Sequence, residues 1–512
     1  MFSFVRHFLN YTLFIVDIEQ KRMLNIAMTL EQLLKLVEKK PLVWRPRVCS
    51  DSRNIRQGDI FVAVKGSKMD GHNFIGLAAV SGARYIVTQQ PAQVASAEVI
   101  QTDDTTKALG LLSQAYYNYP NSKLVNLAVT GTNGKTTTTY MVRSIISNSG
   151  KKCGLIGTVM IDLGDGRDNI ESKMTTPDAL ELASYAEKMA VAGSQYMIME
   201  ASSHAIEQNR LAGIDFTAAA FTNFTGDHLD YHKTMEAYLA AKLRLFENLS
   251  PDSTAIINKD DPVCEQVAAA TKANRIFYSL SAPADLTIKQ ISMDINGTVF
   301  DILYKGEKAR VSSPLIGEHN LSNHLAAAGL ALGAGFDLKT IAKGLSKLDV
   351  VPGRLHKVPS KRDFTVLVDY AHTDDALKHV LSTLQPLCRG RLITVFGCGG
   401  DRDKTKRPRM AQVAQQYANR IFVTSDNPRS EKPMSIIEDV LAGFTNPQAE
   451  NITIQPDRKK AIEDAICDAK SGDIVLIAGK GHENYQIIGA EKQHFSDIET
   501  AAECLQSSPS LV

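Results

Sequence analysis

The stretch Leu127–Thr139 reads L-A-V-T-G-T-N-G-K-T-T-T-T, and it decides the fold of the segment around it. An apolar run ends there in a glycine turn, Gly131–Gly134, and a helix-like pattern of apolar residues follows from Tyr140 to Ile146. Glycines let backbone N–H groups approach phosphate oxygens, the helix N-terminus adds positive potential, and Lys135 can neutralise β- and γ-phosphate charge. The stretch therefore predicts a strand, a nucleotide-binding loop and a helix, in preference to an ordinary strand–helix turn.

The predicted phosphate contacts follow this loop residue by residue. They are Gly131, Thr132, Asn133, Gly134, Lys135, Thr136 and Thr137. The Thr136 hydroxyl stands where such loops usually hold Mg²⁺. The first glycine of the long form of the motif would fall at Val129, so this is the shorter form, which argues against a general GTPase or motor protein.

The composition of the whole chain narrows the class of protein. A length of 512 residues is too great for one core and suggests about three domains. Apolar residues make up 44% and charged residues 22%, as in ordinary soluble proteins. The net charge of +1 gives no electrostatic case for binding nucleic acid or an anionic membrane. The seven cysteines are scattered and lack CxxC spacing, which indicates reduced cytosolic thiols, not disulfides or a zinc site.

Residues 1–27 are predicted to be an extension that is irrelevant to function. The apolar run Phe8–Val16 is too short to span a bilayer, and no small-residue cleavage site follows it. A weak membrane-contacting helix is the alternative for this segment. Thr29 can cap a helix that begins at Leu30, where the globular part of the chain is expected to start.

The pattern of apolar runs and turns predicts an α/β protein of three domains. We expect a small α/β N-terminal domain at 28–122, a central P-loop parallel-sheet ATPase domain at 123–349 and a C-terminal Rossmann-like domain at 350–512. A polar linker at 118–123 and a second linker, Val350–Arg354, are expected to separate them. Apolar runs alternate with helical patterns in the central domain, namely Tyr196–Met199, Ala218–Phe221, Thr254–Ile257 and Leu325–Leu332.

Four predicted strands of the C-terminal domain each end in a polar or glycine-rich turn. They are Val366–Val368, Leu392–Phe396, Ile421–Thr424 and Ile474–Ile477. Ligands of doubly wound sheets bind beyond the carboxyl ends of the strands. The four turns therefore predict one shared site.

Two groups outside the loop could anchor Mg²⁺. Glu200 ends the apolar run Tyr196–Met199, behind the phosphate loop, where a second metal anchor is expected. His228, beside Asp227, is by itself more typical of a helix cap or a core histidine. Together with Thr136 and Glu200 it becomes a plausible metal ligand.

Lys242 and a basic cluster are open to more than one interpretation. Lys242 shares a helix face with Tyr238 and Phe246, so it is either a snorkelling lysine or a buried amine that loses its proton and is modified.

The cluster Lys404–Arg409 has no interleaved aromatic residues. It predicts a clamp for phosphate or carboxylate, or a solvated face, in preference to a nucleic-acid site.

Six motifs follow one another along the chain: Thr130–Thr136, Glu200–His204, Asp227–His232, Pro352–Arg354, Asp369–Thr373 and Gly399–Asp403. In this order they resemble the motifs of the Mur ligase family, the ATP-dependent amino-acid ligases of bacterial cell-wall synthesis. Asp51–Arg53, with Gly58–Ala63, resembles the uridine-binding domain of the family member that acts third. Asp426–Arg429 resembles the motif of members that use meso-diaminopimelate, whose second carboxylate an arginine can grip bidentately. The resemblance covers the chain from Met28 onward.

The resemblance implies an enzyme of the bacterial cytoplasm without stable membrane association. It implies that ATP phosphorylates a carboxylate of UDP-N-acetylmuramoyl-L-alanyl-D-glutamate, that the amine of meso-2,6-diaminopimelate attacks the acyl phosphate, and that phosphate leaves. Mg²⁺ is the implied cofactor, and Lys135 would help stabilise the transferring phosphoryl group. The three domains would close around the substrates to exclude water.

The resemblance also assigns roles to residues of all three domains. Catalysis is implied for Lys135, His228 and Lys242, with Lys242 modified to a carbamate (N6-carboxylysine). Metal binding is implied for Thr136, Glu200 and His228. Asn320, Arg354 and Asp369 would join the loop in binding ATP. The UDP-linked substrate would contact Ser50, Ser52, Ser67, Lys68, Met69, Thr175, Thr176, Ser202, Gln208 and Arg210. Diaminopimelate would contact Arg402, Asp426, Asn427, Pro428, Arg429, Gly479 and Glu483, with Glu483 opposite its distal ammonium.

Two residues differ from the family motifs, and three other functions compete with this interpretation. Asp374 stands where the family usually has proline, and Met174 stands where some members have asparagine. The rivals are the ligase that adds D-alanyl-D-alanine, folylpolyglutamate synthase and a non-catalytic ATP-binding protein. The Asp426–Arg429 motif argues against the first two, and the joint presence of Lys135 and Lys242 argues against the third.

Overall fold

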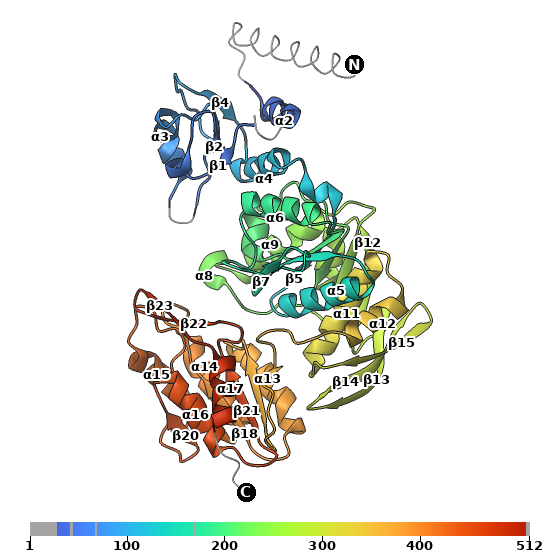
Figure 1. Cartoon of the computed structure of the whole chain (residues 1–512), viewed down its shortest axis with the longest axis vertical. Helices are drawn as coiled ribbons and strands as arrows, with labels where there is room; N and C mark the ends of the chain where they lie inside the picture. The colour runs from blue at the N-terminus through green and yellow to red at the C-terminus, as the bar shows by residue number, and fades with distance from the viewer. Residues whose placement is uncertain (1–27, 41–44, 67–68, 168, 508–512) are drawn as a thin grey trace.

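The computed structural model describes residues 28–40, 45–66, 69–167 and 169–507, which fold into three α/β domains in chain order (Figure 1). The N-terminal domain (blue) and the C-terminal domain (orange to red) lie at opposite ends of the molecule, with the central domain between them. The predicted fold class is confirmed. The extension at 1–27, with Ser67 and Lys68, lies outside the described residues. The domain boundaries stay predictions, and each large sheet lies between them.

The N-terminal domain is a four-stranded parallel sheet in the order β1-β2-β3-β4. Its strands are β1 (Val48–Cys49), β2 (Ile60–Val62), β3 (Tyr85–Thr88) and β4 (Glu98–Gln101), and its α-helices are α2 (Leu30–Lys39), α3 (Ile75–Val80) and α4 (Thr105–Tyr116). Thr29 caps α2 and forms a capping box with Gln32, which confirms the predicted helix start.

The central domain is built on an eleven-stranded sheet in the order β15-β14-β13-β12-β11-β10-β5-β9-β6-β7-β8. Its strands are β5 (Val125–Thr130), β6 (Cys153–Ile156), β7 (Met160–Asp162), β8 (Ile170–Glu171), β9 (Tyr196–Glu200), β10 (Ala218–Phe221), β11 (Thr254–Asn258), β12 (Asn274–Ser279), β13 (Leu286–Asp294), β14 (Gly297–Tyr304) and β15 (Glu307–Ser313). Its helices are α5 (Lys135–Asn148), α6 (Ala179–Val191), α7 (Ser203–Glu207), α8 (Leu229–His232), α9 (Met235–Glu247), α10 (Cys264–Ala270), α11 (Glu318–Gly333) and α12 (Leu338–Ser346). The neighbouring strands β13, β12, β11, β10, β5, β9 and β6 pair in parallel. The pairs β13–β14, β14–β15, β6–β7 and β7–β8 are antiparallel.

Burial on both faces explains why β5 reads as a continuous apolar run. Leu127 and Val129 face the core formed with α5 and α11, and Ala128 faces the core on the other side of the sheet. Helix α12 packs closely against α5 at Gly344. A Cβ at this position would collide with the backbone of Ile145, so the close contact requires glycine. Three of the predicted apolar runs are strands β9, β10 and β11, whereas the fourth lies within helix α11.

The C-terminal domain is a six-stranded sheet in the order β16-β17-β21-β18-β19-β20, parallel except for β16. Its strands are β16 (His356–Lys357), β17 (Thr365–Asp369), β18 (Leu392–Phe396), β19 (Arg420–Val423), β20 (Ile452–Ile454) and β21 (Ile474–Ala478), followed by the hairpin β22 (Tyr485–Ile488) and β23 (Glu491–His494). Its helices are α13 (Asp374–Leu384), α14 (Lys406–Tyr417), α15 (Pro433–Leu441), α16 (Arg458–Asp468) and α17 (Asp497–Ser507). Helices α13, α14 and α15 cover one face and α16 and α17 the other, so the predicted doubly wound arrangement is confirmed.

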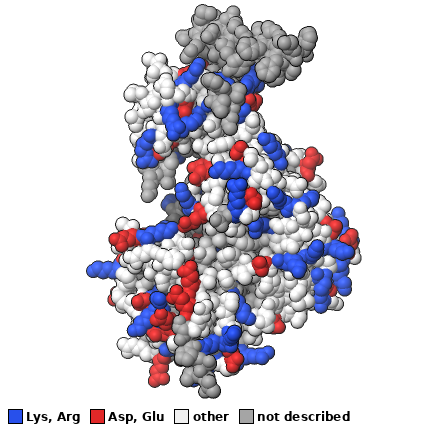
Figure 2. Space-filling model, in the orientation of Figure 1, with Lys and Arg blue, Asp and Glu red and all other residues white. Residues whose placement is uncertain are grey.

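The face of the molecule shown in Figure 2 carries charged side chains of both signs. Acidic and basic side chains are interspersed over the face shown in Figure 2, in keeping with the net charge of +1. None of the helices in the described ranges combines the length and the apolar character needed to cross a membrane.

Candidate active site

The phosphate loop connects β5 to α5, as predicted. Gly131 and Gly134 have φ angles of 141° and 87°, in the region that favours glycine. A Cβ at Gly131 would overlap the Thr222 hydroxyl, and a Cβ at Gly134 would overlap the side-chain oxygen of Asn323. Both glycines are therefore required by the backbone and by the neighbours of the loop.

Lys135 folds over this loop. Its Nζ donates to the carbonyl oxygens of Gly131 (2.9 Å) and Thr132 (2.8 Å). Burial lowers the pKa of the Lys135 ammonium, while the carboxylates of Glu200 and Asp227 oppose this shift. The loop thus combines an ammonium group with the backbone N–H groups of a helix N-terminus, which is the chemistry of a phosphate site.

Glu200 and Thr136 meet behind the loop, as predicted. The Thr136 Oγ1 donates to Glu200 Oε1 at 3.0 Å, and Glu200 is almost completely buried at the end of β9. Thr158, which the sequence analysis missed, donates to Oε1 through its backbone N–H (2.8 Å) and to Oε2 through its hydroxyl (3.0 Å). A hydroxyl beside a buried carboxylate is a hard-oxygen pair of the kind that Mg²⁺ takes next to a nucleotide, so the residues fit this ion.

His228 is the third predicted metal ligand, and its metal role stays a prediction. It has a left-handed backbone with φ of 54°, just before α8, and its Nε2 lies 3.4 Å from Asp227 Oδ2. Its ring contacts those of His204 and Tyr238, with centroids 5.0 and 6.0 Å apart. Within the described part of the chain, no group of three or more His, Cys, Asp or Glu side chains forms a metal cluster.

Lys242 is buried on α9, with 1% of its surface exposed. Its Nζ donates to the carbonyl oxygen of Gly131 at 2.8 Å and lies 4.4 Å from the centre of the Tyr238 ring. Burial and the neighbouring Lys135 ammonium hold the pKa of Lys242 well below its ordinary value. The interpretation as a snorkelling lysine is therefore wrong, and the side chain is a buried amine that can be neutral.

The remaining predicted ATP residues lie on both sides of the domain boundary. Asn320 is buried in α11 and donates to Ile316 O at 2.8 Å, while its Oδ1 accepts from Asn323. Asn323 was missed, although its spacing of three residues from Asn320 places both on one helix face. Arg354 reaches the loop from the C-terminal linker, with its guanidinium 3.5 Å from Thr136 Oγ1.

Asp369 organises the turn beside Arg354. Its two carboxylate oxygens accept from the backbone N–H groups of Leu355 (2.7 Å) and Ala371 (2.8 Å). Burial raises the pKa of Asp369, and the Arg354 guanidinium opposes this. Asp369 therefore fixes the backbone around Arg354.

Five residues predicted to bind the UDP-linked substrate form one cluster beneath Glu200. Thr176 Oγ1 donates to the backbone oxygen of Glu200 (2.8 Å) and accepts from Ser202 N (3.0 Å). Arg210 donates to Thr176 O (2.8 Å) and to Gln208 Oε1 (2.7 Å). The hydroxyl oxygen of the fifth, Thr175, lies 3.0 Å from that of Thr158. Met174, one of the two departures, adjoins this cluster through its sulfur, 3.7 Å from Arg210 Nη1.

The other residues predicted for this substrate lie in the N-terminal domain. Ser50 is exposed, Ser52 is buried in a turn capped by Asp51, and Met69 is 61% exposed. Ser67 and Lys68 lie outside the described residues. The assignment of these five residues stays a prediction.

The residues predicted for diaminopimelate are brought together at the carboxyl ends of β18, β19 and β21. Asn427 Nδ2 donates to Glu483 Oε2 at 2.9 Å, and a Cβ at Gly479 would lie 2.8 Å from Asp426 Oδ2. Arg429 Nη1 donates to Gly400 O at 2.7 Å. Gly400 packs so tightly against the Pro428 carbonyl that a Cβ would overlap it.

The two arginines of this cluster, Arg402 and Arg429, both lie next to Gly399. A Cβ at Gly399 would lie 3.0 Å from Arg429 Nη1 and 3.9 Å from Arg402 Cγ. Arg402 is exposed and Arg429 is half-buried. These residues lie close together at the ends of β18, β19 and β21, while the shared site itself and the role of each residue in binding stay predictions.

The basic cluster Lys404–Arg409 contains an arginine, Arg407, that forms ion pairs within its own domain. Arg407 is fully buried, and its guanidinium pairs with Glu431 and Asp439 at 2.8 Å each. This contact holds the pKa of Glu431 down to about 2. The prediction of a ligand clamp or a solvated face is therefore wrong for Arg407, because its partners are carboxylates of the same domain.

Asp374 preserves the turn where the family usually has proline. It is the first residue of α13, after the Thr373 cap, and it accepts from Arg409 Nε at 2.8 Å. A carboxylate at a helix N-terminus is favourable, just as proline is acceptable there.

A chain of rings joins the nucleotide side to the amino-acid side. The Arg354 guanidinium lies 5.0 Å from the centre of the Tyr370 ring, and Tyr370 lies 5.1 Å from the His482 ring. Burial lowers the pKa of His482 to about 4, so this ring is neutral near pH 7. Glu483 is the next residue. Tyr370 and His482 thus connect two half-sites, the nucleotide half-site around Lys135 and the amino-acid half-site around Asn427. The sequence motifs of the two half-sites do not predict this connection.

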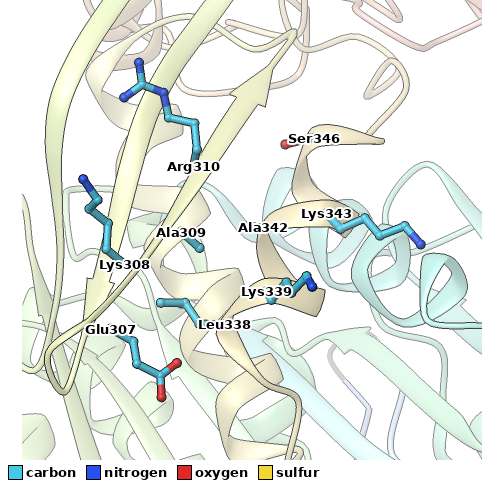
Figure 3. A pocket seen from close by; sticks show the side chains of 9 residues that line it. All are labelled: Glu307, Lys308, Ala309, Arg310, Leu338, Lys339, Ala342, Lys343 and Ser346. Atoms are coloured by element: carbon cyan, nitrogen blue, oxygen red, sulfur yellow. The ribbon is translucent and has the colours of Figure 1, made fainter.

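A separate pocket of about 430 Å³ lies between β15 and α12 (Figure 3). The charged ends of Lys308, Arg310 and Lys343 point in different directions. Asp301 pairs with both Lys308 (3.5 Å) and Arg310 (2.9 Å). The pocket therefore lacks converging charges and belongs to neither half-site.

The fold and the two half-sites define a three-domain protein that couples a nucleotide loop to an amino-acid site. Three family models match the chain: the Mur ligase family, catalytic domain at 47–117, the Mur ligase middle domain at 129–331 and the Mur ligase, glutamate ligase domain at 353–481. The chain belongs to the Mur ligase family.

Several curated relatives share one name. The UDP-N-acetylmuramoyl-L-alanyl-D-glutamate--2,6-diaminopimelate ligase of Bacillus cereus is 43% identical over 89% of this chain and 93% of its own length. The ligase of this name from Gloeobacter violaceus is 44% identical over 89% and 93%. A solved structure of such a ligase matches with a TM-score of 0.66 at 35% identity, over 90% of this chain and 94% of its own. The MurF ligase of Thermotoga maritima, solved with ADP, shares the fold at 20% identity and a TM-score of 0.59, over 91% and 98%.

Proposed function

We propose that the chain is an ATP-dependent ligase that joins meso-2,6-diaminopimelate to UDP-N-acetylmuramoyl-L-alanyl-D-glutamate, with release of ADP and phosphate. The reaction belongs to the synthesis of peptidoglycan precursors, and we assign it to the bacterial cytoplasm. The relatives named for this reaction, at 41–44% identity over about nine-tenths of the chain, support the proposal.

The observation that carries the choice of amino acid is the charge pattern at the strand ends of the C-terminal domain. The side chains of Arg402 and Arg429 both lie next to Gly399, and the Glu483 carboxylate lies on the neighbouring loop beside Asn427. Diaminopimelate carries two carboxylates and two ammonium groups. Arginine binds a carboxylate bidentately, and a carboxylate binds an ammonium group, so the site matches a diamino diacid better than lysine.

The residues of the central domain match the first chemical step, transfer of the γ-phosphoryl group to the substrate carboxylate. Lys135 and the loop backbone would hold the phosphates of ATP, and Arg354 would reach the same place from the C-terminal linker. Thr136 and Glu200 would hold Mg²⁺, which neutralises phosphate charge when it is bound.

Lys242 is proposed to act as a carbamate. A neutral amine attacks CO₂ and releases a proton, which converts a cation into a group with two carboxylate-type oxygens. The lowered pKa of Lys242 provides the neutral amine, and its place beside Gly131 brings those oxygens to the phosphate loop. His228, whose ring lies 6.0 Å from that of Tyr238, would assist in placing the substrate carboxylate.

The second step is attack of an amine of diaminopimelate on the acyl phosphate. The amine forms the amide bond, loses a proton, and phosphate departs with the bonding electrons. The Thr176 cluster would hold the muramoyl-dipeptide, and the site around Asn427 and Arg429 would hold the amino acid, so that the two meet between the domains. Exclusion of water protects the acyl phosphate from hydrolysis.

Phosphate release, measured with several amino acids in parallel, tests the proposal. The protein is given ATP, Mg²⁺ and the UDP-linked dipeptide, with meso-diaminopimelate, lysine or D-alanyl-D-alanine. We expect sustained release with diaminopimelate and much less with the other two. Equal or faster release with lysine or D-alanyl-D-alanine would refute the assignment of the amino acid.

A further inference from the structure

Lys480 is a buried cation that ties together the two loops of the amino-acid site. Its side chain has 0% exposure, and its Nζ donates to Glu483 Oε2 at 2.9 Å and to Asn427 Oδ1 at 3.2 Å. Lys480 and Glu483 follow β21, whereas Asn427 follows β19. A buried ammonium needs polar partners, and here both partners are residues proposed to contact the substrate.

The contacts of Lys480 close into a triangle that fixes its two partners. Asn427 Nδ2 donates to Glu483 Oε2 at 2.9 Å, and Asn427 Oδ1 also accepts from the backbone N–H of Ile487 at 2.9 Å. The amide oxygen thus faces two donors, and the amide nitrogen faces a carboxylate. Both bonds that the described residues give to the Glu483 carboxylate fall on Oε2. Oε1 is therefore the oxygen that can receive a group from outside.

The backbone of this loop explains why Lys480 points inward and Glu483 does not. Glu483 N donates to Lys480 O at 3.0 Å, which closes a tight turn. Gly479 and Gly481, with φ of 121° and 58°, lie on either side of Lys480, and a Cβ at Gly481 would lie 2.8 Å from Tyr370 Cβ. Within this turn Lys480 is completely buried and the Glu483 side chain is 15% exposed.

We propose that Lys480 is a positioning residue for the amino-acid substrate, an inference that rests on the proposed function. Its ammonium holds the Glu483 carboxylate and the Asn427 amide in one orientation, so that Glu483 Oε1 meets the distal ammonium of the diamino acid. Lys480 touches no reacting atom and acts through Glu483. Its loss therefore weakens binding of the amino acid and leaves the phosphoryl-transfer step in place.

The test compares kcat and KM in three lysine variants. Lys480→Met removes the charge at similar length, and Lys480→Gln keeps a hydrogen-bond donor. The Nζ of Lys480 lies 5.4 Å from the centre of the Tyr485 ring, and that of Lys492 lies 4.0 Å from it. The matched control is therefore Lys492→Met, because Lys492 is exposed and pairs with Glu171. We expect the KM for diaminopimelate to rise about tenfold in Lys480→Met, as for one lost charge-assisted hydrogen bond, and less in Lys480→Gln. The kcat and the KM for ATP should change less than about twofold, which is within the scatter of a neutral substitution.

A double-mutant cycle separates positioning from a merely structural role. If Lys480 acts through Glu483, adding Lys480→Met to Glu483→Gln causes no further rise in KM. Independent effects of the two substitutions would overturn the proposal, and so would a wild-type KM in both Lys480 variants.

A further pair of variants tests the proposal if the Lys480 variants do not fold. If neither Lys480 variant folds, the double substitution of Lys480 and Glu483 by methionine replaces the buried ion pair with apolar groups, which proteins often tolerate. The proposal then requires the same KM as in Glu483→Met alone, and a further increase refutes it. Failure of the wild type to ligate diaminopimelate would instead overturn the proposed function.

Discussion

Lys135 and Lys242 donate to the same acceptor, the carbonyl oxygen of Gly131, at 2.9 and 2.8 Å. Two ammonium groups this close repel each other in a buried site, and burial together with the Lys135 ammonium depresses the pKa of Lys242. The arrangement is explained if one amine gives up its charge. Lys242 is the more deeply buried of the two, so it is the one expected to be neutral and reactive.

The first prediction concerns the carbamate. Lys242→Ala should lose nearly all ligase activity and regain part of it with small carboxylic acids, which supply the missing oxygens. Lys242→Arg keeps a cation and should stay inactive, because guanidinium forms no carbamate. The measurement is kcat with and without added acetate or formate, with Lys152→Ala as an exposed control. Full activity in the arginine variant would mean that the lysine acts as a cation or only packs.

The second prediction concerns pH and stability in CO₂-depleted buffer. The folded-state pKa of Lys242 lies below its unfolded value, so between the two the unfolded chain binds one more proton. The free energy of unfolding should then rise with pH, by about 1.4 kcal/mol per unit for one proton. The same titration of Lys242→Met should lack this component. Identical pH profiles for the two proteins would show that the amine is not perturbed.

The third prediction concerns substrate choice. In Arg429→Ala the kcat/KM for diaminopimelate should fall about 30-fold to several-thousand-fold, as when a buried charge pair is broken. The affinities for ATP and the UDP-linked substrate should hardly change, since Arg429 lies in the other half-site, with its Nη1 on Gly400 O. Kinetics with diaminopimelate and with lysine measure the effect, and the exposed Arg389→Ala is the control. A diaminopimelate preference that survives in Arg429→Ala would move specificity to Arg402 or Glu483.

The fourth prediction concerns the support beneath the amino-acid loops. Arg458 and Asp497 form a fully buried bidentate pair at 2.7 Å, and Arg458 also donates to the carbonyls of Ser425 and Ala478. Asp497→Asn leaves a buried charge without its partner and should cost about 3–5 kcal/mol of stability. Denaturant unfolding measures this. The double variant Arg458→Met with Asp497→Leu should recover much of the loss; if it is no more stable than Asp497→Asn, the pair is not what stabilises the two strand ends.

The sequence is most predictive where a function depends on neighbouring residues. Gly131 through Thr136 form one loop, and the C-terminal strands are short apolar runs bounded by turns, so both could be predicted from local pattern. The antiparallel strands β13, β14 and β15 were missed. Asn296-Gly297 and Lys305-Gly306 between them are hairpin signals that could have indicated them.

Contacts between distant residues could not be predicted in this way. Thr158 reaches Glu200 across 42 residues, and Lys480 reaches Asn427 across 53. Nothing in the spacing of Lys480 distinguishes a buried cation from a solvated one, because its burial depends on the packing of two loops around it. For Arg407 the local pattern was misleading. The pattern indicated a ligand clamp, whereas the guanidinium of Arg407 pairs with Glu431 and Asp439 of the same domain.

The most direct test of the central claim follows the oxygen atoms of the substrate. Both carboxylates of the glutamate in the UDP-linked dipeptide are labelled with ¹⁸O. The labelled dipeptide is incubated with ATP, Mg²⁺ and meso-diaminopimelate, and the products are analysed by mass spectrometry. An acyl-phosphate route predicts one ¹⁸O in the released phosphate and formation of the UDP-linked tripeptide that contains diaminopimelate. Unlabelled phosphate, or ATP hydrolysis without the tripeptide, would contradict the assigned reaction.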